Sequence, residues 1–193
     1  MKKFVFAIIL ALYSLLSYAQ GSMIVVNSQD PVTGLRTFRT SEVLVRNGMT
    51  DRHPLRVCVA AYEGAEGWRY DLRVAVTELL SHAVPEGGVL LLRTKSGEVV
   101  ELANTLDAVS SRDYVGQWIG DTAQKMYYNV GMYPVTRAQL EAIAAGVVKL
   151  RMQIGGGSFD TEYKKERLGA AVAAHLSALD AAFAGPDDLR SDF

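Results

Sequence analysis

Three consecutive glycines followed by a serine, Gly155 to Ser158, are the residues that could most directly do chemistry. They lie between a predicted strand and a predicted long helix, and the free N–H groups at a helix start attract anions. We therefore predict a phosphate, sulfate or carboxylate site at Gly156, Gly157 and Ser158. The spacing matches neither G-x-x-x-x-G-K-[ST] nor G-x-G-x-x-G. A hinge before the helix, capped by Ser158 or Asp160, is the simpler interpretation.

The histidines and the single cysteine form no recognisable catalytic or metal-binding pattern. No two of His53, His82 and His175 share a metal-ligand spacing. No G-x-S-x-G motif marks a nucleophilic serine, although a Ser-His-Asp set could still assemble in three dimensions. Cys58 falls in a predicted strand and is expected to be a buried small apolar residue. We predict no catalytic residue, no metal site and no cofactor.

Acidic residues near two glycines offer a second possibility. Glu63, Glu66 and Asp71 lie around Gly64 and Gly67, and paired carboxylates perform acid–base chemistry in many enzymes. The composition Glu-Gly-x-Glu-Gly is typical of a turn, so a polar hairpin tip is the simpler explanation.

Aromatic residues offer a third possibility. Trp118, together with Tyr114, and the pair Tyr127-Tyr128 would form a platform for a sugar ring or a partner protein if they were exposed. If buried, they are ordinary core residues, which is the interpretation we favour. They lie in or near residues 104–121, the least regular part of the chain, and binding sites often lie in loops.

Strands must position these side chains through most of the chain. Apolar residues alternate with polar ones at Trp68–Thr77 and Val148–Ile154, the pattern of an antiparallel sheet with one face in water. Residues 89–93 and 98–102 flank a short loop with a glycine and predict a hairpin. Weaker strand predictions are Met23–Val26, Leu35–Arg46, Leu55–Tyr62 and Lys125–Tyr133.

Two helices follow from local patterns. Thr136 and Gln139 form a capping box for a short helix that Gly146 ends. A longer helix is predicted from about Thr161 to Ala184, before Gly185-Pro186. It carries one apolar stripe, formed by Leu168, Val172, Leu176, Leu179 and Phe183.

Strands come first and the long helix comes last, which predicts an α+β domain. We expect a bent antiparallel sheet, sandwich-like or barrel-like, with a short helix before the last strand and the C-terminal helix packed on the sheet. This plan is similar to the pleckstrin-homology-like barrel, which also ends in a capping helix, but the short helix departs from it.

The first nineteen residues resemble an export signal. Lys2 and Lys3 precede the apolar run Phe4–Leu16, and Ser17-Tyr18-Ala19 provides the small residues of a cleavage site before Gln20. Removing residues 1–19 leaves no membrane span and 18 basic against 21 acidic residues, a balance that argues against nucleic acid as a partner. The predicted domain spans residues 20–185, followed by a flexible tail at 186–193. The expected location is the periplasm or the outside of a Gram-negative bacterium.

One segment resembles a known pattern. It comprises Tyr133-Pro134-Val135-Thr136, Gln139-Leu140, Ile143 and Gly146 to Arg151. It is similar to a recurring pattern in uncharacterised secreted proteins of gut Bacteroides-like bacteria. The resemblance implies a capped helix leading into a strand and an exported location, and it carries no activity.

These observations predict a non-enzymatic exported module that binds an unidentified protein or small molecule, or that belongs to an envelope assembly. A small hydrolase using His82 or His53 with a neighbouring acid is the alternative. A β-barrel carrier of an apolar ligand is the third possibility.

Overall fold

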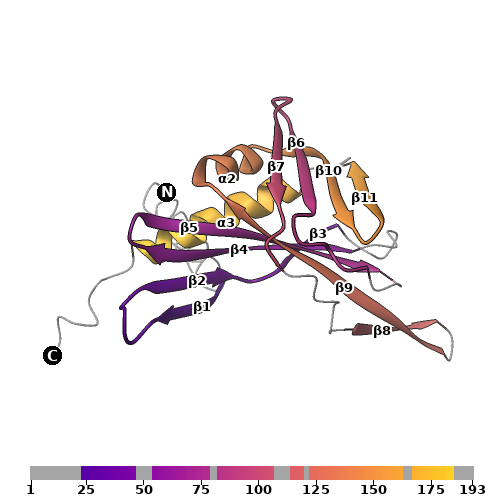
Figure 1. Cartoon of the computed structure of the whole chain (residues 1–193), viewed down its shortest axis with the longest axis horizontal. Coiled ribbons are helices and arrows are strands. Elements are labelled where there is room, and N and C mark those ends of the chain that lie inside the picture. Colours follow the sequence, from indigo (N-terminus) through magenta and orange to yellow (C-terminus); the bar gives the residue numbers. More distant parts are fainter. Residues whose placement is uncertain are drawn as a thin grey trace, which may run out of the picture.

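The computed structural model describes residues 23–46, 54–78, 82–106, 114–119, 122–162 and 167–184. The predicted signal at 1–19, the predicted tail at 186–193 and His53 lie outside these ranges. The described residues form eleven strands and two helices (Figure 1). In chain order these are β1 Ile24–Gln29, β2 Arg36–Thr40, β3 Val43–Arg46, β4 Leu55–Gly64, β5 Gly67–Glu78, β6 Val89–Thr94, β7 Val99–Ala103, β8 Tyr114–Ile119, β9 Thr122–Val135, α2 Arg137–Ala144, β10 Val147–Ile154, β11 Gly157–Glu162 and α3 Leu168–Phe183.

The strands form two antiparallel sheets. The larger has the order β1-β2-β4-β5-β9-β8, with β3 also paired to β4, and the smaller has the order β11-β10-β6-β7. This confirms the predicted α+β class. Neither sheet closes on itself in the described residues, so the barrel-like form of the prediction is not adopted. The region predicted as one strand at 35–46 is two strands, β2 and β3, and the sequence did not predict β8 or β11.

Both helices and the smaller sheet lie on one side of the larger sheet (Figure 1). Helix α3 packs mainly against β4 and α2, with further contacts to β1, β2 and β3. Buried side chains from the two sheets and the two helices form one continuous cluster. The predicted packing of the C-terminal helix on the sheet is therefore confirmed.

The apolar stripe of α3 faces this core as predicted. Leu168, Val172, Leu176 and Leu179 are buried, and Phe183 packs at the edge of the cluster. The predicted start of the helix at Thr161 is wrong, because α3 begins at Leu168.

Residues 157–162 form β11, which is why the helix starts late. Every residue of β11 pairs with β10, from Gly157 opposite Ile154 to Glu162 opposite Lys149. Phe159 and Thr161 are buried while the residues between them are exposed, the alternation of a strand with one covered face. The last strand is therefore β11 and not β10. The short helix α2 precedes two strands, whereas the sequence predicted that it precedes only the last one.

Helix α2 has the predicted capping box. The Thr136 hydroxyl accepts a hydrogen bond from the Gln139 N–H, and the Gln139 side chain accepts one from the Thr136 N–H. Gly146 has φ of +125°, a backbone conformation that favours glycine where a helix ends. Local sequence is therefore enough to place both ends of this helix.

Strand β5 departs from its predicted alternation at one end. Ala75 and Thr77 were expected in water but are buried. Arg56 on β4 and Tyr128 on β9 flank β5, and an Arg56 nitrogen donates a hydrogen bond of 2.6 Å to the Tyr128 hydroxyl. These two long side chains meet across β5 and cover the short ones between them.

Candidate functional site

An open groove lies where the β4–β5 hairpin meets the start of α2. It has a volume of about 640 Å³, which is within the range of roughly 300–1,000 Å³ typical of small-molecule sites. The lining side chains come from the hairpin, from the end of β9 and from the first turn of α2. They are Tyr62, Trp68, Arg69, Tyr70, Asp71, Pro134, Val135, Thr136, Arg137 and Gln139.

The groove opens because β9 stops before β5 does. The last residue pair between these strands is Tyr70 opposite Val135, whereas β5 continues along β4 as far as Gly67. Thr136 turns the chain into α2 through its capping box. The hairpin therefore projects beyond β9, and the first turn of α2 forms the facing wall.

Aromatic packing fixes one side of the groove. The ring of Trp68 stacks on Phe183 of α3, with centroids 4.1 Å apart and planes 13° from parallel. Phe38 packs against both rings, and the Arg36 guanidinium lies 5.3 Å from the centroid of Trp68. Glu63 in turn pairs with Arg36 at 3.1 Å. Trp68 is therefore held rigidly, and α3 supports this wall.

A tyrosine–carboxylate pair supplies directed polar groups. The Tyr62 hydroxyl faces the Asp71 carboxylate on the neighbouring strand, close enough for each group to affect the pKa of the other. Burial raises the pKa of Asp71 above its ordinary value, while the Arg69 charge and the nearby Tyr62 hydroxyl act in the opposite direction. Burial and the Asp71 charge raise the pKa of Tyr62, which keeps it protonated as a donor. The two side chains therefore place a phenolic hydroxyl and a carboxylate side by side in the groove.

Arg69 brings a positive charge to the same end of the groove. It lies directly opposite Tyr62 in the pairing of β4 with β5 and is exposed. Within the described part of the chain it makes no ion pair, although its charge lowers the pKa of Asp71.

Arg137 also lines the groove, but its donors are occupied. Two of its nitrogens donate to the Asp180 carboxylate at 2.5 and 2.8 Å, and a third donates to Glu141 at 2.8 Å. The Asp180 carboxylate first, and then that of Glu141, raises the pKa of Arg137. Its role is to join α2 to α3 and hold the helical wall in place.

The predicted anion site lies elsewhere and has a different setting. Gly156, Gly157 and Ser158 are exposed at the β10–β11 hairpin, where Gly156 has φ of +79°. No helix starts here, because β11 follows directly. The argument from the N–H groups of a helix start therefore does not apply, and the predicted capping role of Asp160 is wrong, because it pairs with Arg151 at 2.6 Å.

The structure places neither His82 nor His175 at the groove, and His53 lies outside the described residues. His175 is fully buried in α3. His82 lies in the segment before β6, and its backbone N–H donates to Asn129, whose side-chain amide donates to the buried carboxylate of Glu78. In the described residues no three His, Cys, Asp or Glu side chains lie together as metal ligands would.

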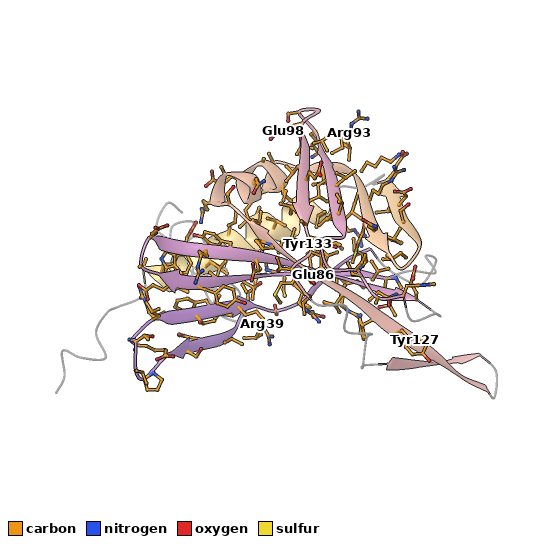
Figure 2. All side chains as sticks on the ribbon, viewed as in Figure 1. Arg39, Glu86, Arg93, Glu98, Tyr127 and Tyr133 are labelled. Carbon is orange, nitrogen blue, oxygen red and sulfur yellow. The ribbon has the colours of Figure 1, made fainter. Side chains whose placement is uncertain are left out.

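The other candidate residues are placed as follows. Cys58 is buried as predicted, and burial raises the pKa of its thiol to about 11. Tyr127 and Tyr128 are half-buried on β9, and Tyr127 lies on the arm in which β9 pairs with β8 (Figure 2). The side chain of Trp118 lies outside the described residues. The hairpin tip predicted around Glu66 is confirmed by the pairing of Gly64 with Gly67.

The sequence pattern does not predict the groove or most of the residues that line it. Tyr62 and Trp68 flank the predicted hairpin tip, and pairing the two strands would have placed Tyr62 beside Arg69. Residues 134–139 were interpreted only as a helix start. Nothing in the sequence indicates that this helix start faces the hairpin.

Comparisons with known proteins found no matching family, no similar curated protein and no similar solved structure. The resemblance of residues 133–151 to secreted bacterial proteins therefore stays a prediction. Neither helix of the described residues combines the length and the apolarity needed to cross a bilayer.

Proposed function

We propose that this protein is an exported, non-enzymatic binding module that holds a saccharide in the groove between the β4–β5 hairpin and α2. The signal predicted at residues 1–19 supports a periplasmic or extracellular location. The lining supports the class of ligand, because rigid aromatic side chains and a few directed polar groups are what an amphipathic ring compound requires.

The observation that carries this proposal is the Tyr62–Asp71 pair inside an aromatic-lined groove. A sugar ring has an apolar face, which packs on an aromatic ring such as Tyr62, and hydroxyl groups, which donate to a carboxylate. The Tyr62 hydroxyl and the Asp71 carboxylate lie next to each other, so one ring can contact the tyrosine while one of its hydroxyl groups donates to the carboxylate. Thr136 and Gln139 add polar side chains on the opposite wall.

The small number of acidic side chains in the groove favours binding of a saccharide over its hydrolysis. Enzymes that cleave glycosidic bonds generally use two acidic side chains, one on each side of the bond. Among the described residues that line the groove, Asp71 is the only acidic one. Glu63, the nearest acid along β4, is hydrogen-bonded to Arg36, whose guanidinium lies over Trp68. We therefore propose a site that retains its ligand unchanged.

A saccharide panel tests this function directly. The chain without residues 1–19 is applied to a glycan array, and hits are measured by isothermal titration calorimetry. Asp71→Asn keeps the shape of the side chain but removes its charge. Because a hydrogen bond to a charged group contributes about 1.5–3 kcal/mol, we expect affinity to fall by about 10- to 100-fold.

Asp160→Asn is the matched control. Asp160 is an exposed carboxylate on β11 in the smaller sheet, so its replacement should leave affinity unchanged. Thermal melts confirm that both variants are folded. Failure of every saccharide on the array to bind, or equal affinities for Asp71→Asn and the wild type, would refute the proposal.

A further inference from the structure

We infer that the bound saccharide is acidic, with a carboxylate or sulfate group on its ring that pairs with Arg69. This inference rests on the proposed function and adds the charge of the ligand. It comes from comparing arginines of the larger sheet and of α2, which differ in what their guanidinium groups contact.

Most of these arginines already have a partner. Arg137 is held by Asp180 and Glu141, as described above. The remaining pairs are Arg36 with Glu63, Arg73 with Glu42, and Arg56 with the hydroxyl and ring of Tyr128. Arg69 differs from these four arginines, because it lines the groove and its guanidinium has no such partner among the described residues.

Arg69 is such an arginine. It lines the groove, it is exposed, and it makes no ion pair within the residues that the structure describes. It lies opposite Tyr62 and two residues before Asp71, so the three side chains share one face of the larger sheet. A ring placed against Tyr62 therefore has a carboxylate near one edge and a guanidinium near another.

Arg39 adds a second positive charge to this face. It pairs with Ala60 of β4, which in turn pairs with Asp71 of β5, so Arg39 and Asp71 lie on the same face with one strand between them. Its positive charge opposes the rise in the Tyr62 pKa that burial and Asp71 cause. Arg39 is exposed and likewise has no ion-pair partner in the described ranges. The two positive charges of Arg39 and Arg69 exceed the single negative charge of Asp71. The face of the sheet beside the groove therefore carries a net positive charge.

This arrangement favours an anionic ligand over a neutral one. A guanidinium group presents parallel N–H donors that match the two oxygens of a carboxylate or two of a sulfate. A neutral sugar would leave most of these donors to water, whereas an acidic group would use two at once. Asp71 would repel an anion placed directly beside it, so it accepts a hydroxyl group while the acidic substituent lies towards Arg69.

Matched pairs of oligosaccharides test this inference. Each pair has the same linkage and length and differs only in a ring substituent: galacturonate against galactose, glucuronate against glucose, and a sulfated galactose oligomer against its unsulfated form. Affinities are measured by calorimetry at pH 7 in 50 and 300 mM salt. We expect at least one acidic member to bind about 10-fold more tightly than its neutral partner, with the difference shrinking in the higher salt. The substituent that binds more tightly shows whether the site recognises a carboxylate or a sulfate.

Arg69→Gln keeps the length and polarity of the side chain but removes its charge. It should abolish the preference for the acidic member and leave the affinity for the neutral member within about two-fold. Arg93→Gln is the control, because Arg93 is exposed on β6, on the hairpin that projects on the opposite side from Arg39 (Figure 2). This control should behave as the wild type does.

The outcomes separate this inference from the proposed function. If neutral and acidic members bind equally, or if Arg69→Gln keeps the preference, the inference is refuted while saccharide binding stands. If no member of any pair binds and the array is also empty, the proposed function itself fails. A preference that both Arg69→Gln and Arg93→Gln reduce equally would reflect net charge alone and would also overturn the inference.

Discussion

A buried histidine should make this protein sensitive to mild acid. His175 is fully buried between α3 and β4, and neither of its ring nitrogens has a hydrogen-bond partner among the described residues. Burial lowers its pKa from 6.5 to about 4, with a smaller opposing effect from the Val57 backbone. The folded protein therefore keeps this ring neutral at pH values where the unfolded chain protonates it.

The sign and size of the effect follow from that difference. As the pH falls below 6.5, the unfolded state gains a proton that the folded state does not bind, so the free energy of unfolding decreases. Each unit of difference in pKa corresponds to about 1.4 kcal/mol, and the whole effect at pH 4 is on the order of 3 kcal/mol. The contribution is complete above pH 6.5 and is lost progressively towards pH 4.

Urea denaturation at pH 7.5, 6.5, 5.5 and 4.5 measures this effect, with His175→Leu as the reference. Leucine fills a similar volume without a titratable group, and it removes a buried polar group that lacks a partner. Acidic residues, including Asp71 with its raised pKa, are common to both proteins, so their contributions cancel in the comparison. The wild type should lose stability relative to His175→Leu as the pH falls. Parallel losses in the two proteins would refute the reasoning.

Three further substitutions test the core, each by urea denaturation at pH 7.5. Leu176→Ala should cost about 2–5 kcal/mol, because Leu176 is buried on the face of α3 that packs on the sheet; a loss below about 0.5 kcal/mol would mean that this face is not packed. Tyr133→Phe should leave stability unchanged or raise it by about 1 kcal/mol, because the Tyr133 hydroxyl is buried without a partner among the described residues; a clear destabilisation would contradict this. Gly131→Ala should cost about 1–3 kcal/mol, because its Cβ would lie 2.6 Å from Cζ of Tyr133, and the Gly131→Ala/Tyr133→Leu double variant should recover part of the loss.

Elements whose determinants are local could be predicted from the sequence. The capping box at Thr136 and Gln139 defines α2 within four residues, and the stripe from Leu168 to Phe183 defines the buried side of α3. The alternation from Tyr70 to Val76 defines the core face of β5. In each case the residues that specify the structure lie within one element.

Elements that depend on a partner strand could not be predicted in the same way. Phe159 and Thr161 are the only two buried positions of β11, too few for alternation to distinguish a strand from the first turn of a helix. Pairing with β10 decides the structure, supported by the ion pairs of Arg151 with Asp160 and Lys149 with Glu162. Ala75 is buried for a comparable reason, since side chains of other strands cover it.

The groove could be predicted less well than β11 or the buried end of β5, because it depends on the order of the strands in the sheet. Residues 62–71 and 134–139 line it together only because β9 pairs with β5 on the side away from β4. Strand order is set by packing across the whole sheet and leaves no pattern in a single segment. The Tyr62–Asp71 pair is therefore visible only once β4 and β5 are in register.

The same few residues that end β9 also create the groove. Pro134 opposes Asp71 on β5 but has no N–H to donate, and one residue after Val135 the capping box of Thr136 starts α2. The chain therefore leaves the sheet while β5 still has three residues, Gly67 to Arg69, that pair only with β4. Arg137 then fixes the helix to α3 through Asp180, and α3 fixes Trp68 through Phe183. The Trp68 ring and the first turn of α2 are thus both tied to α3, and this shared support favours a fixed distance between them.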